Sequence, residues 1–403
     1  MTRSAAPLRV AFALGSATGG SARHVAALAA GCRAAGLAVS VLAPAPTLAL
    51  LSVDAGIETF SLNISDRPRP ASDMVTIVRL RSRLAAWRPD VLHAHGVRAG
   101  AVAALAIGGT GRSNRGLRGL APRRHRRPAL AVTVHNAPPA GRRGRLVYGV
   151  LERICAWRAD LVLCASADLA ARMRDLGVAE VQQFDVPARE ATRPSPDEVT
   201  KARADIGAGD RPVVLTVARL APQKGLDVLI EAAGRWRHHD PRPCTVIAGD
   251  GPLAAALRAQ ASRVRADVLL LGPRQDVPAL LEIADVVVVP SRWEARALIL
   301  QEAMRSGKPI VATSVGGTPE LVRGDSASQD SASQDSASQD CAVLIPPDDP
   351  AVLAAAVTAV LDDPSLAARL RLAAKARSAA FATEKDAVKA AIATYERLAA
   401  SRS

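Results

Sequence analysis

Short apolar runs that alternate with longer helical segments constrain this chain more than any other feature. In the first half, runs rich in Val, Leu and Ile are separated by Ala-, Leu- and Arg-rich segments of helical period. This alternation is typical of parallel βα units whose strands are buried on both faces. We expect strands at Arg9–Leu14, Val39–Ala43, Ile57–Leu62, Asp90–Ala94, Leu130–His135 and Asp160–Ala165.

The alternation restarts after a polar, proline-rich stretch from Pro187 to Pro196, which we interpret as a linker between domains. Further strands are expected at Pro212–Val217, Cys244–Gly249, Val268–Gly272, Val286–Pro290, Lys308–Thr313 and Ala342–Ile345. The sequence therefore predicts an α/β protein with two Rossmann-like, doubly wound domains at residues 1–188 and 197–382. A helix at 383–403 is long enough to pack back on the first domain.

Two features of composition limit the classes of protein to which the chain can belong. Hydrophobic residues make up 49% and charged residues 22%, as in a folded globular protein. The net charge of +14 comes almost entirely from arginine, a bias that a GC-rich genome produces, and aromatic residues are only 2%. Base-stacking surfaces are therefore scarce, and we do not expect a nucleic-acid partner.

The cysteines and the apolar runs bear on the cellular compartment. The five cysteines form no CxxC pair, so neither a disulfide framework nor a zinc site is indicated. No run of 18 apolar residues occurs, and Arg9 interrupts the apolar stretch near the N-terminus. We expect a cytoplasmic protein.

Residues 326–340 repeat the sequence SASQD three times. Because Ser, Gln and Asp bury little surface, we interpret the repeat as an insertion in a solvated loop of the second domain.

Two segments at the ends of expected strands could bind an anion. Gly19 and Gly20 follow the first strand and precede a helix, so their backbone N–H groups could face a phosphate, although glycines also serve ordinary tight turns. Arg219 and Lys224 follow the first strand of the second half, where both could stabilise a leaving diphosphate or simply be solvated surface cations.

Two glutamates eight residues apart, Glu294 and Glu302, follow the strand expected at Val286–Pro290. They resemble the EX7E motif of retaining GT-B glycosyltransferases, and the chain as a whole resembles glycosyltransferase family 4. The matching segments are ARLAPQKG, AGDGPL, LGPRQDVPALLEIADVVVVPSRWE and GKPIVATSVGGTPELV, all in the second half. The first half matches more loosely, through the Gly19–Gly20 loop, VLHAHG and VTVHN.

The resemblance implies a GT-B fold, in which two Rossmann-like domains face each other across a cleft, and a sugar donor that is a nucleotide diphosphate sugar. It also implies retention at the anomeric carbon, no metal ion and no cofactor. The acceptor could be a glycan, a lipid-linked molecule or a small molecule. The site residues that it implies are His135 and Glu294 for catalysis at the sugar, Arg219 and Lys224 at the diphosphate, Glu302 at the ribose, and Gly19 and Gly20 at the phosphates from the first domain.

Two segments depart from the family pattern. Ala295-Arg296-Ala297 stands where the family often has Gly-Phe-Gly, and Phe184-Asp-Val-Pro187 replaces Pro-Asn-Gly-Val-Asp. At the first segment, the alanine side chains leave the backbone less room to approach the donor than glycine would. At the second segment, no donor contact is inferred from the family.

His93 and His95 are two residues apart, so a strand would point both to one face. They could be metal ligands or could be held by hydrogen bonds in a structural role, and the sequence leaves both readings open.

The segment Arg112–Arg145 is strongly basic, and from Val91 to Leu151 the chain has 11 Arg and no Asp or Glu. Such a segment would be attracted to an anionic membrane surface, which would make the protein peripheral to the inner face of the membrane. A basic loop without a partner is the alternative. Two other functions also stay open: a catalytically silent GT-B-like binding protein and a basic nucleic-acid-binding protein.

Overall fold

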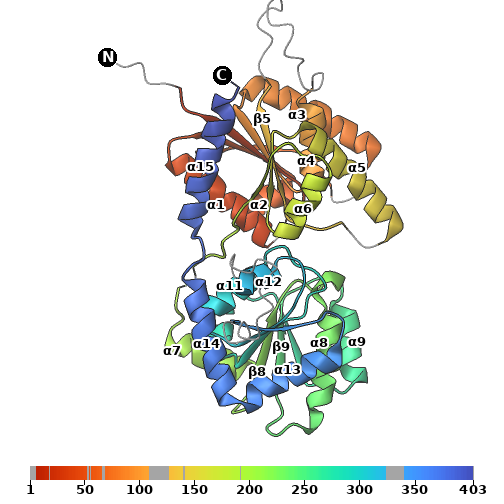
Figure 1. Ribbon diagram of the computed structural model, residues 1–403, viewed down its shortest axis with the longest axis vertical. Helices are drawn as coiled ribbons and strands as arrows, with labels where there is room; N and C mark the ends of the chain where they lie inside the picture. The colour runs from red at the N-terminus through yellow and green to blue at the C-terminus, as the bar shows by residue number, and fades with distance from the viewer. Residues whose placement is uncertain are drawn as a thin grey trace, which may run out of the picture. The chain divides into compact units, whose positions relative to one another are not determined.

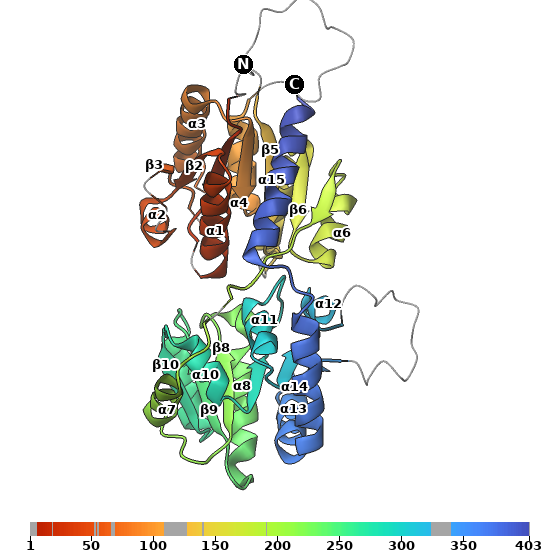
Figure 2. The same cartoon turned by 90° about the vertical axis from the view of Figure 1, so that its left-hand side faces the viewer.

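The computed structural model describes residues 6–17, 19–51, 54, 56–65, 69–108, 127–138, 141–190, 192–323 and 340–402. Most of the SASQD repeat and half of the Arg112–Arg145 segment, residues 112–126, 139 and 140, lie outside these residues. The chain divides into two compact units, one made of Met1–Pro187 with Ala382–Ser403 and the other of Ala188–Phe381. Figure 1 and Figure 2 show the helices and strands of both units.

The first unit is built on a seven-stranded parallel sheet with the order β3-β2-β1-β4-β5-β6-β7. Its central strands are buried because helices cover both faces of the sheet. The strands are β1 (Arg9–Leu14), β2 (Ala38–Ala43), β3 (Glu58–Ser61), β4 (Val91–His95), β5 (Ala129–Val134), β6 (Leu161–Cys164) and β7 (Val181–Gln183).

The helices of the first unit come from both ends of the chain. They are α1 (Gly20–Ala34), α2 (Ala45–Leu51), α3 (Pro70–Trp87), α4 (Val97–Ala106), α5 (Arg142–Arg158), α6 (Ala167–Asp175) and α15 (Glu384–Ala400). A capping box between Thr383 and Asp386 starts α15, which packs on α1 and contacts β4. The close approach of α15 to α1 requires a glycine, since a Cβ on Gly31 would lie 2.4 Å from a methyl group of Val388.

The second unit is a six-stranded parallel sheet with the order β10-β9-β8-β11-β12-β13. Its strands are β8 (Val213–Val217), β9 (Cys244–Ala248), β10 (Val268–Gly272), β11 (Val286–Val289), β12 (Ile310–Thr313) and β13 (Val343–Ile345). The α-helices are α7 (Pro196–Asp205), α8 (Leu226–Arg235), α9 (Ala254–Arg263), α10 (Val277–Ile283), α11 (Leu298–Arg305), α12 (Thr318–Arg323), α13 (Pro350–Asp362) and α14 (Pro364–Ser378). Separate apolar clusters cover the two faces of this sheet.

The prediction of two doubly wound, Rossmann-like domains is confirmed. All twelve expected strands are present within one or two residues at each end, and β4 extends one residue further than expected, to His95. The three-residue edge strand β7 was not predicted.

Across the part of the chain that the structure describes, no single helix is long and apolar enough to cross a membrane. Among the described helices, only α13 and α14 taken together have that length and composition, and the pair is bent by 97°.

Candidate functional site

In the second unit, the order of strands along the sheet reverses between β8 and β11. Loops that leave the carboxyl ends of two such strands diverge, and ligands of doubly wound sheets bind at this point. Lys224 follows β8 in a 3-10 turn, Pro222–Lys224, and Glu294 follows β11. Their side chains meet, with Lys224 Nζ 2.5 Å from Glu294 Oε1. Ser291 Oγ donates a second hydrogen bond to the same carboxylate oxygen, at 2.6 Å.

A glycine allows the two loops to approach so closely. Gly225 has φ +61°, and a Cβ there would lie 2.0 Å from the carbonyl oxygen of Pro290, at the end of β11. Any other residue would push the turn that carries Lys224 away from the loop that carries Glu294.

A second pair of loops fixes the backbone at Arg219. Ala218 N donates to Ala248 O and Leu220 N to Asp250 O, so both neighbours of Arg219 are hydrogen-bonded to the β9 loop. The Arg219 side chain is exposed, and its guanidinium has no hydrogen-bond or ion-pair partner among the described residues. A fixed backbone thus presents a cation that is unpaired within this part of the chain.

Glu302 lies in the second turn of α11 and is partly buried. The loop before that helix is fixed through the Glu294 backbone, whose carbonyl oxygen accepts from Gly317 N at 2.9 Å. Gly316 also passes close to it, since a Cβ there would lie 2.0 Å from the same oxygen. Ala295 and Ala297, which replace the family's glycines, are both buried.

Arg292 was not predicted from the sequence, although its side chain links the loops around Lys224 and Glu294. It pairs with Asp227 at 2.7 Å and with Asp348 at 2.7 Å, and it donates to the carbonyl oxygen of Pro222 at 2.6 Å. It therefore connects the turn before Lys224 to the loop that carries Glu294. No local sequence pattern reveals this role, because its partners are far away along the chain.

In the first unit, His93 and His95 point to the same face of β4 but have different surroundings. Both ring nitrogens of His93 are engaged, Nε2 with Thr133 Oγ1 at 2.6 Å and Nδ1 with the Tyr395 hydroxyl at 2.7 Å. His93 therefore has a structural role, with no nitrogen left for a metal. Across the described residues, no group of three or more His, Cys, Asp or Glu could hold a metal ion.

His95 instead belongs to a cluster with His135 and with His24, which the sequence did not indicate. His95 Nδ1 lies 3.4 Å from His135 Nε2, and their rings stack with centroids 5.7 Å apart. The His24 ring, from α1, lies 6.0 Å from His95 and 6.2 Å from His135. The Nε2 atoms of His24 and His95 are buried, with no hydrogen-bond partner among the described residues.

Burial keeps these histidines neutral. It lowers the pKa of His24 and His93 to about 3 and that of His135 to about 4, and it lowers the pKa of His95 well below its usual value. Repulsion between the neighbouring rings lowers the pKa of His24, His93 and His95 further. At neutral pH the cluster can accept or donate hydrogen bonds but carries no charge.

Gly19 and Gly20 stand at the start of α1, on the loop after β1. Gly19 has φ +67°, and a Cβ there would meet no atom within 4 Å. The glycine is thus needed for its backbone conformation and borders open space. Strand order reverses between β1 and β4, so this loop and His95 both lie at the switch point of the first sheet.

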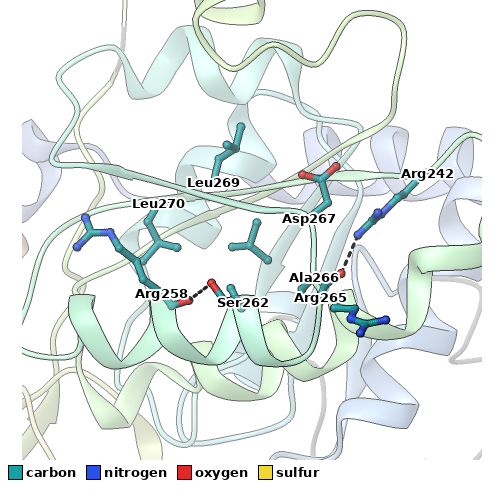
Figure 3. Close-up of a pocket in the computed structure, with 10 residues that line it drawn as sticks. Arg242, Arg258, Ser262, Arg265, Ala266, Asp267, Leu269 and Leu270 are labelled. Carbon is teal, nitrogen blue, oxygen red and sulfur yellow. Dashed lines mark hydrogen bonds between the residues drawn. The ribbon is translucent and has the colours of Figure 1, made fainter.

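A cavity of about 610 Å³ lies beside β10 and α9, lined in part by Arg242, Arg258 and Arg265 (Figure 3). None of the predicted donor-binding residues lines it.

Comparison with known proteins identifies the family. Residues 19–188 match the model of the "Glycosyl transferase 4-like domain", and residues 198–377 match "Glycosyl transferases group 1". The chain belongs to this glycosyltransferase family. The resemblance stated from the sequence is therefore confirmed, whereas the EX7E motif and the roles of individual residues are not tested by these matches.

The curated relatives of this glycosyltransferase are matched over part of their length. The alpha-D-kanosaminyltransferase of Streptomyces kanamyceticus is 31% identical over 206 residues, which are 50% of this chain and 48% of that protein. The glycogen synthase of Mycobacterium tuberculosis is 31% identical over 305 residues, 72% of this chain and 64% of that protein. The chain spans about half or less of the length of the first relatives.

Solved structures confirm the GT-B fold of the glycosyltransferase. Anabaena Alr3699/HepE in complex with UDP and glucose has a TM-score of 0.77 at 20% identity, covering 96% of this chain and 99% of that one. Sucrose-phosphate synthase from Thermosynechococcus elongatus has a TM-score of 0.76 at 20% identity, covering 97% and 99%.

Proposed function

We propose that this glycosyltransferase transfers a sugar from a nucleotide diphosphate sugar to an acceptor, with retention of the anomeric configuration and without a metal ion. The observation that supports this best is the contact between Lys224 and Glu294 at the switch point of the second sheet. It joins a cation suited to the diphosphate with a carboxylate suited to the sugar hydroxyls. Two similar proteins support a nucleotide-sugar donor: Anabaena Alr3699/HepE, solved in complex with UDP-glucose, and a GDP-mannose-dependent mannosyltransferase of Mycolicibacterium smegmatis.

In the proposed reaction the leaving diphosphate gains negative charge as the glycosidic bond breaks. Arg219, which is exposed and unpaired among the described residues, and Lys224 would stabilise that charge in place of a metal ion. Glu294 would orient Lys224 and contact the transferred sugar, while Glu302 would bind the ribose hydroxyls. The acceptor would attack the anomeric carbon from the same face of the sugar as the one from which the diphosphate leaves. An oxygen of the leaving phosphate would accept the proton that the acceptor loses.

For the first unit, we propose that His135 contacts the transferred sugar and that the Gly19–Gly20 backbone contacts phosphate. Its lowered pKa of about 4 keeps His135 neutral, so it would hydrogen-bond to a sugar hydroxyl without adding charge. His95, 3.4 Å away, would fix the orientation of the His135 ring.

The acceptor is proposed to be a glycan, a lipid-linked molecule or a small molecule. A lipid-linked acceptor would agree with peripheral attachment to the inner face of the membrane through the Arg112–Arg145 segment. Within that segment, Arg142, Arg143 and Arg145 are exposed in the first turn of α5.

The proposed diphosphate site is tested by Arg219→Ala and Lys224→Ala. Each should slow donor hydrolysis at least about 100-fold, as expected for losing one preorganised charge contact at a developing anion. Lys201→Ala and Arg263→Ala remove exposed cations on α7 and α9 and serve as matched controls. Near-normal hydrolysis by both site variants would rule the site out.

Two further measurements test the finer parts of the proposal. Activity should survive a chelator, because no step uses a metal ion. The anomeric configuration of the product, determined by NMR, should match that of the donor. An inverted product would contradict the mechanism while leaving the diphosphate site intact.

A further inference from the structure

Exposed large apolar side chains of the described residues gather on three helices of the first unit, α3, α4 and α5. Eleven such side chains are exposed, and eight of them lie on these helices, whereas Leu50, Val352 and Leu372 lie singly elsewhere. The eight are Met74, Val75, Val78, Leu105, Leu146, Val147, Val150 and Trp157. Scattered exposed residues are normal, but a concentration of this kind marks a surface that binds something.

The three helices are consecutive in the sequence and lie side by side, with α4 in contact with both α3 and α5 (Figure 1). Nearly all of α4 is buried, so α3 and α5 provide most of the outer surface. We refer to the eight exposed apolar residues, together with the arginines beside them, as the α3–α5 face.

The arrangement of side chains on α5 shows that its apolar residues are aligned. Leu146, Val150 and Trp157 are spaced by four and seven residues and therefore share one side of the helix. They are 69%, 49% and 60% exposed. Glu152 and Cys155 are buried on the side toward the core. The outer side of α5 therefore exposes a line of apolar side chains, although the Arg158 guanidinium stacks on the Trp157 ring, 4.4 Å from its centroid.

The same face is positively charged. Arg142, Arg143 and Arg153 are exposed beside the apolar stripe of α5. The acidic residues of the three helices are neutralised, since Asp73 pairs with Arg98 at 2.5 Å and Glu152 with Arg172 at 2.6 Å. The face thus combines apolar surface with positive charge that no acidic residue of these helices balances.

We propose that the α3–α5 face docks on an anionic lipid bilayer, with its apolar side chains entering the interface and its arginines contacting lipid phosphates. A Trp beside Leu and Val, flanked by Arg, is the composition of helices that lie in a membrane interface. The charge disfavours pairing with a second copy of the chain, because two such faces would bring like charges together. The inference rests on the membrane part of the proposed function and names the side chains that enter the bilayer.

The apolar contribution is tested by a variant that carries Leu146→Gln, Val150→Gln and Trp157→Gln. These side chains are exposed, so the fold should be retained. A control carries Leu50→Gln, Val352→Gln and Leu372→Gln, which are also apolar and exposed but lie outside the face. Binding is measured by sedimentation with phosphatidylcholine vesicles with and without phosphatidylglycerol.

The full chain should sediment with the anionic vesicles at low salt. The apolar variant should bind at least about tenfold more weakly, because several buried CH₂ groups are lost, and the control should bind like the unmodified chain. A chain that stays in the supernatant, or equal binding by the apolar variant and its control, would overturn the proposal.

The charge contribution is tested by Arg142→Gln, Arg143→Gln and Arg153→Gln together. This variant should bind roughly 100-fold more weakly at low salt, with a smaller difference at high salt. Equal binding of the unmodified chain to neutral and anionic vesicles would contradict the charge requirement. Donor hydrolysis in solution should be the same in all variants, which separates a failure of docking from a failure of the proposed chemistry. If light scattering shows a dimer that the apolar variant loses, without any vesicle binding, the face is a self-contact and the proposal is wrong.

Discussion

In the folded first unit, three buried histidines are neutral: His24, His93 and His135. Burial lowers their pKa to about 3, 3 and 4, from an unfolded value near 6.5. Between these limits the unfolded chain binds protons that the native state does not bind, so the free energy of unfolding decreases as the pH falls. Each histidine can contribute a slope of about 1.4 kcal/mol per pH unit in that window.

We therefore expect the first unit to lose stability between pH 7 and pH 5, and His24→Gln to reduce that loss. Thermal melting of the two proteins across this pH range provides the measurement. If the melting temperatures of the two proteins fall by the same amount as the pH is lowered, the low pKa of His24 is contradicted.

His239, in the second unit, gives a control of opposite sign. Its pKa is raised by the carbonyl oxygen of Pro241 and by Asp362, so its stabilisation is present below the usual pKa and is lost as the pH rises. His239→Gln should therefore lower stability at acidic pH more than at alkaline pH.

At the scale of residues, the sequence indicated Lys224 and Glu294 through a motif but not their contact. The two are 70 positions apart, and only the order of strands brings them together. His24 could not be found at all, because a lone histidine in a helix has no spacing that relates it to His95 or His135. Whether the predicted residues act as proposed stays a prediction.

At the scale of elements, two glycines in the interior of helices have opposite roles. A Cβ on Gly31 in α1 would lie 2.4 Å from Val388 in α15, whereas one on Gly149 in α5 would meet only the end of Arg153, at 3.8 Å. Gly31→Ala should lower the free energy of unfolding by about 1–3 kcal/mol through overpacking. Gly149→Ala should raise it by about 0.5–1 kcal/mol, because alanine favours the helix.

Denaturant unfolding measures both effects, and a compensating change provides the check. Adding Val388→Ala to Gly31→Ala removes the methyl groups that clash and should recover part of the loss. If Gly31→Ala is as stable as the unmodified protein, α15 does not pack on α1 as closely as described.

The central strands were predictable because they are short, mainly apolar segments between longer helical ones, although β4 also contains His93 and His95. The edge strand β7 was missed because it has only three residues, Val-Gln-Gln, and pairs on one side. Periodicity carries no signal over so short a stretch. The contact of α15 with β4 includes a hydrogen bond between Tyr395 and His93, which are 302 residues apart in the sequence. No local pattern predicts such a contact, so only the length of the helix suggested that it could pack on the first unit.

At the scale of the whole molecule, the first unit is made of two separate stretches of chain, while the second is one continuous stretch. Ala387, Ala391, Tyr395 and Leu398 of α15 are buried in the first unit. We expect fragment 188–381 to unfold cooperatively by itself. Fragment 1–187 should bind an apolar dye until a peptide of residues 382–403 is added.

Calorimetry and dye fluorescence distinguish these states. A peptide with Tyr395→Ala is the matched control and should restore the fragment less well, since it lacks both the buried ring and the bond to His93. Fragment 1–187 melting as sharply without the peptide as with it would show that α15 is dispensable for this unit.

The divided first unit also sets an order of events during translation. The ribosome releases the chain from its N-terminus, so the second unit has all of its residues once Phe381 has emerged. At that moment the first unit still lacks α15, so the surface of α1 around Gly31 has been uncovered since α1 was made. The first unit is therefore synthesised first but completes its folding last. While residues 188–381 are being translated, its uncovered α1 surface is accessible to a nascent-chain chaperone.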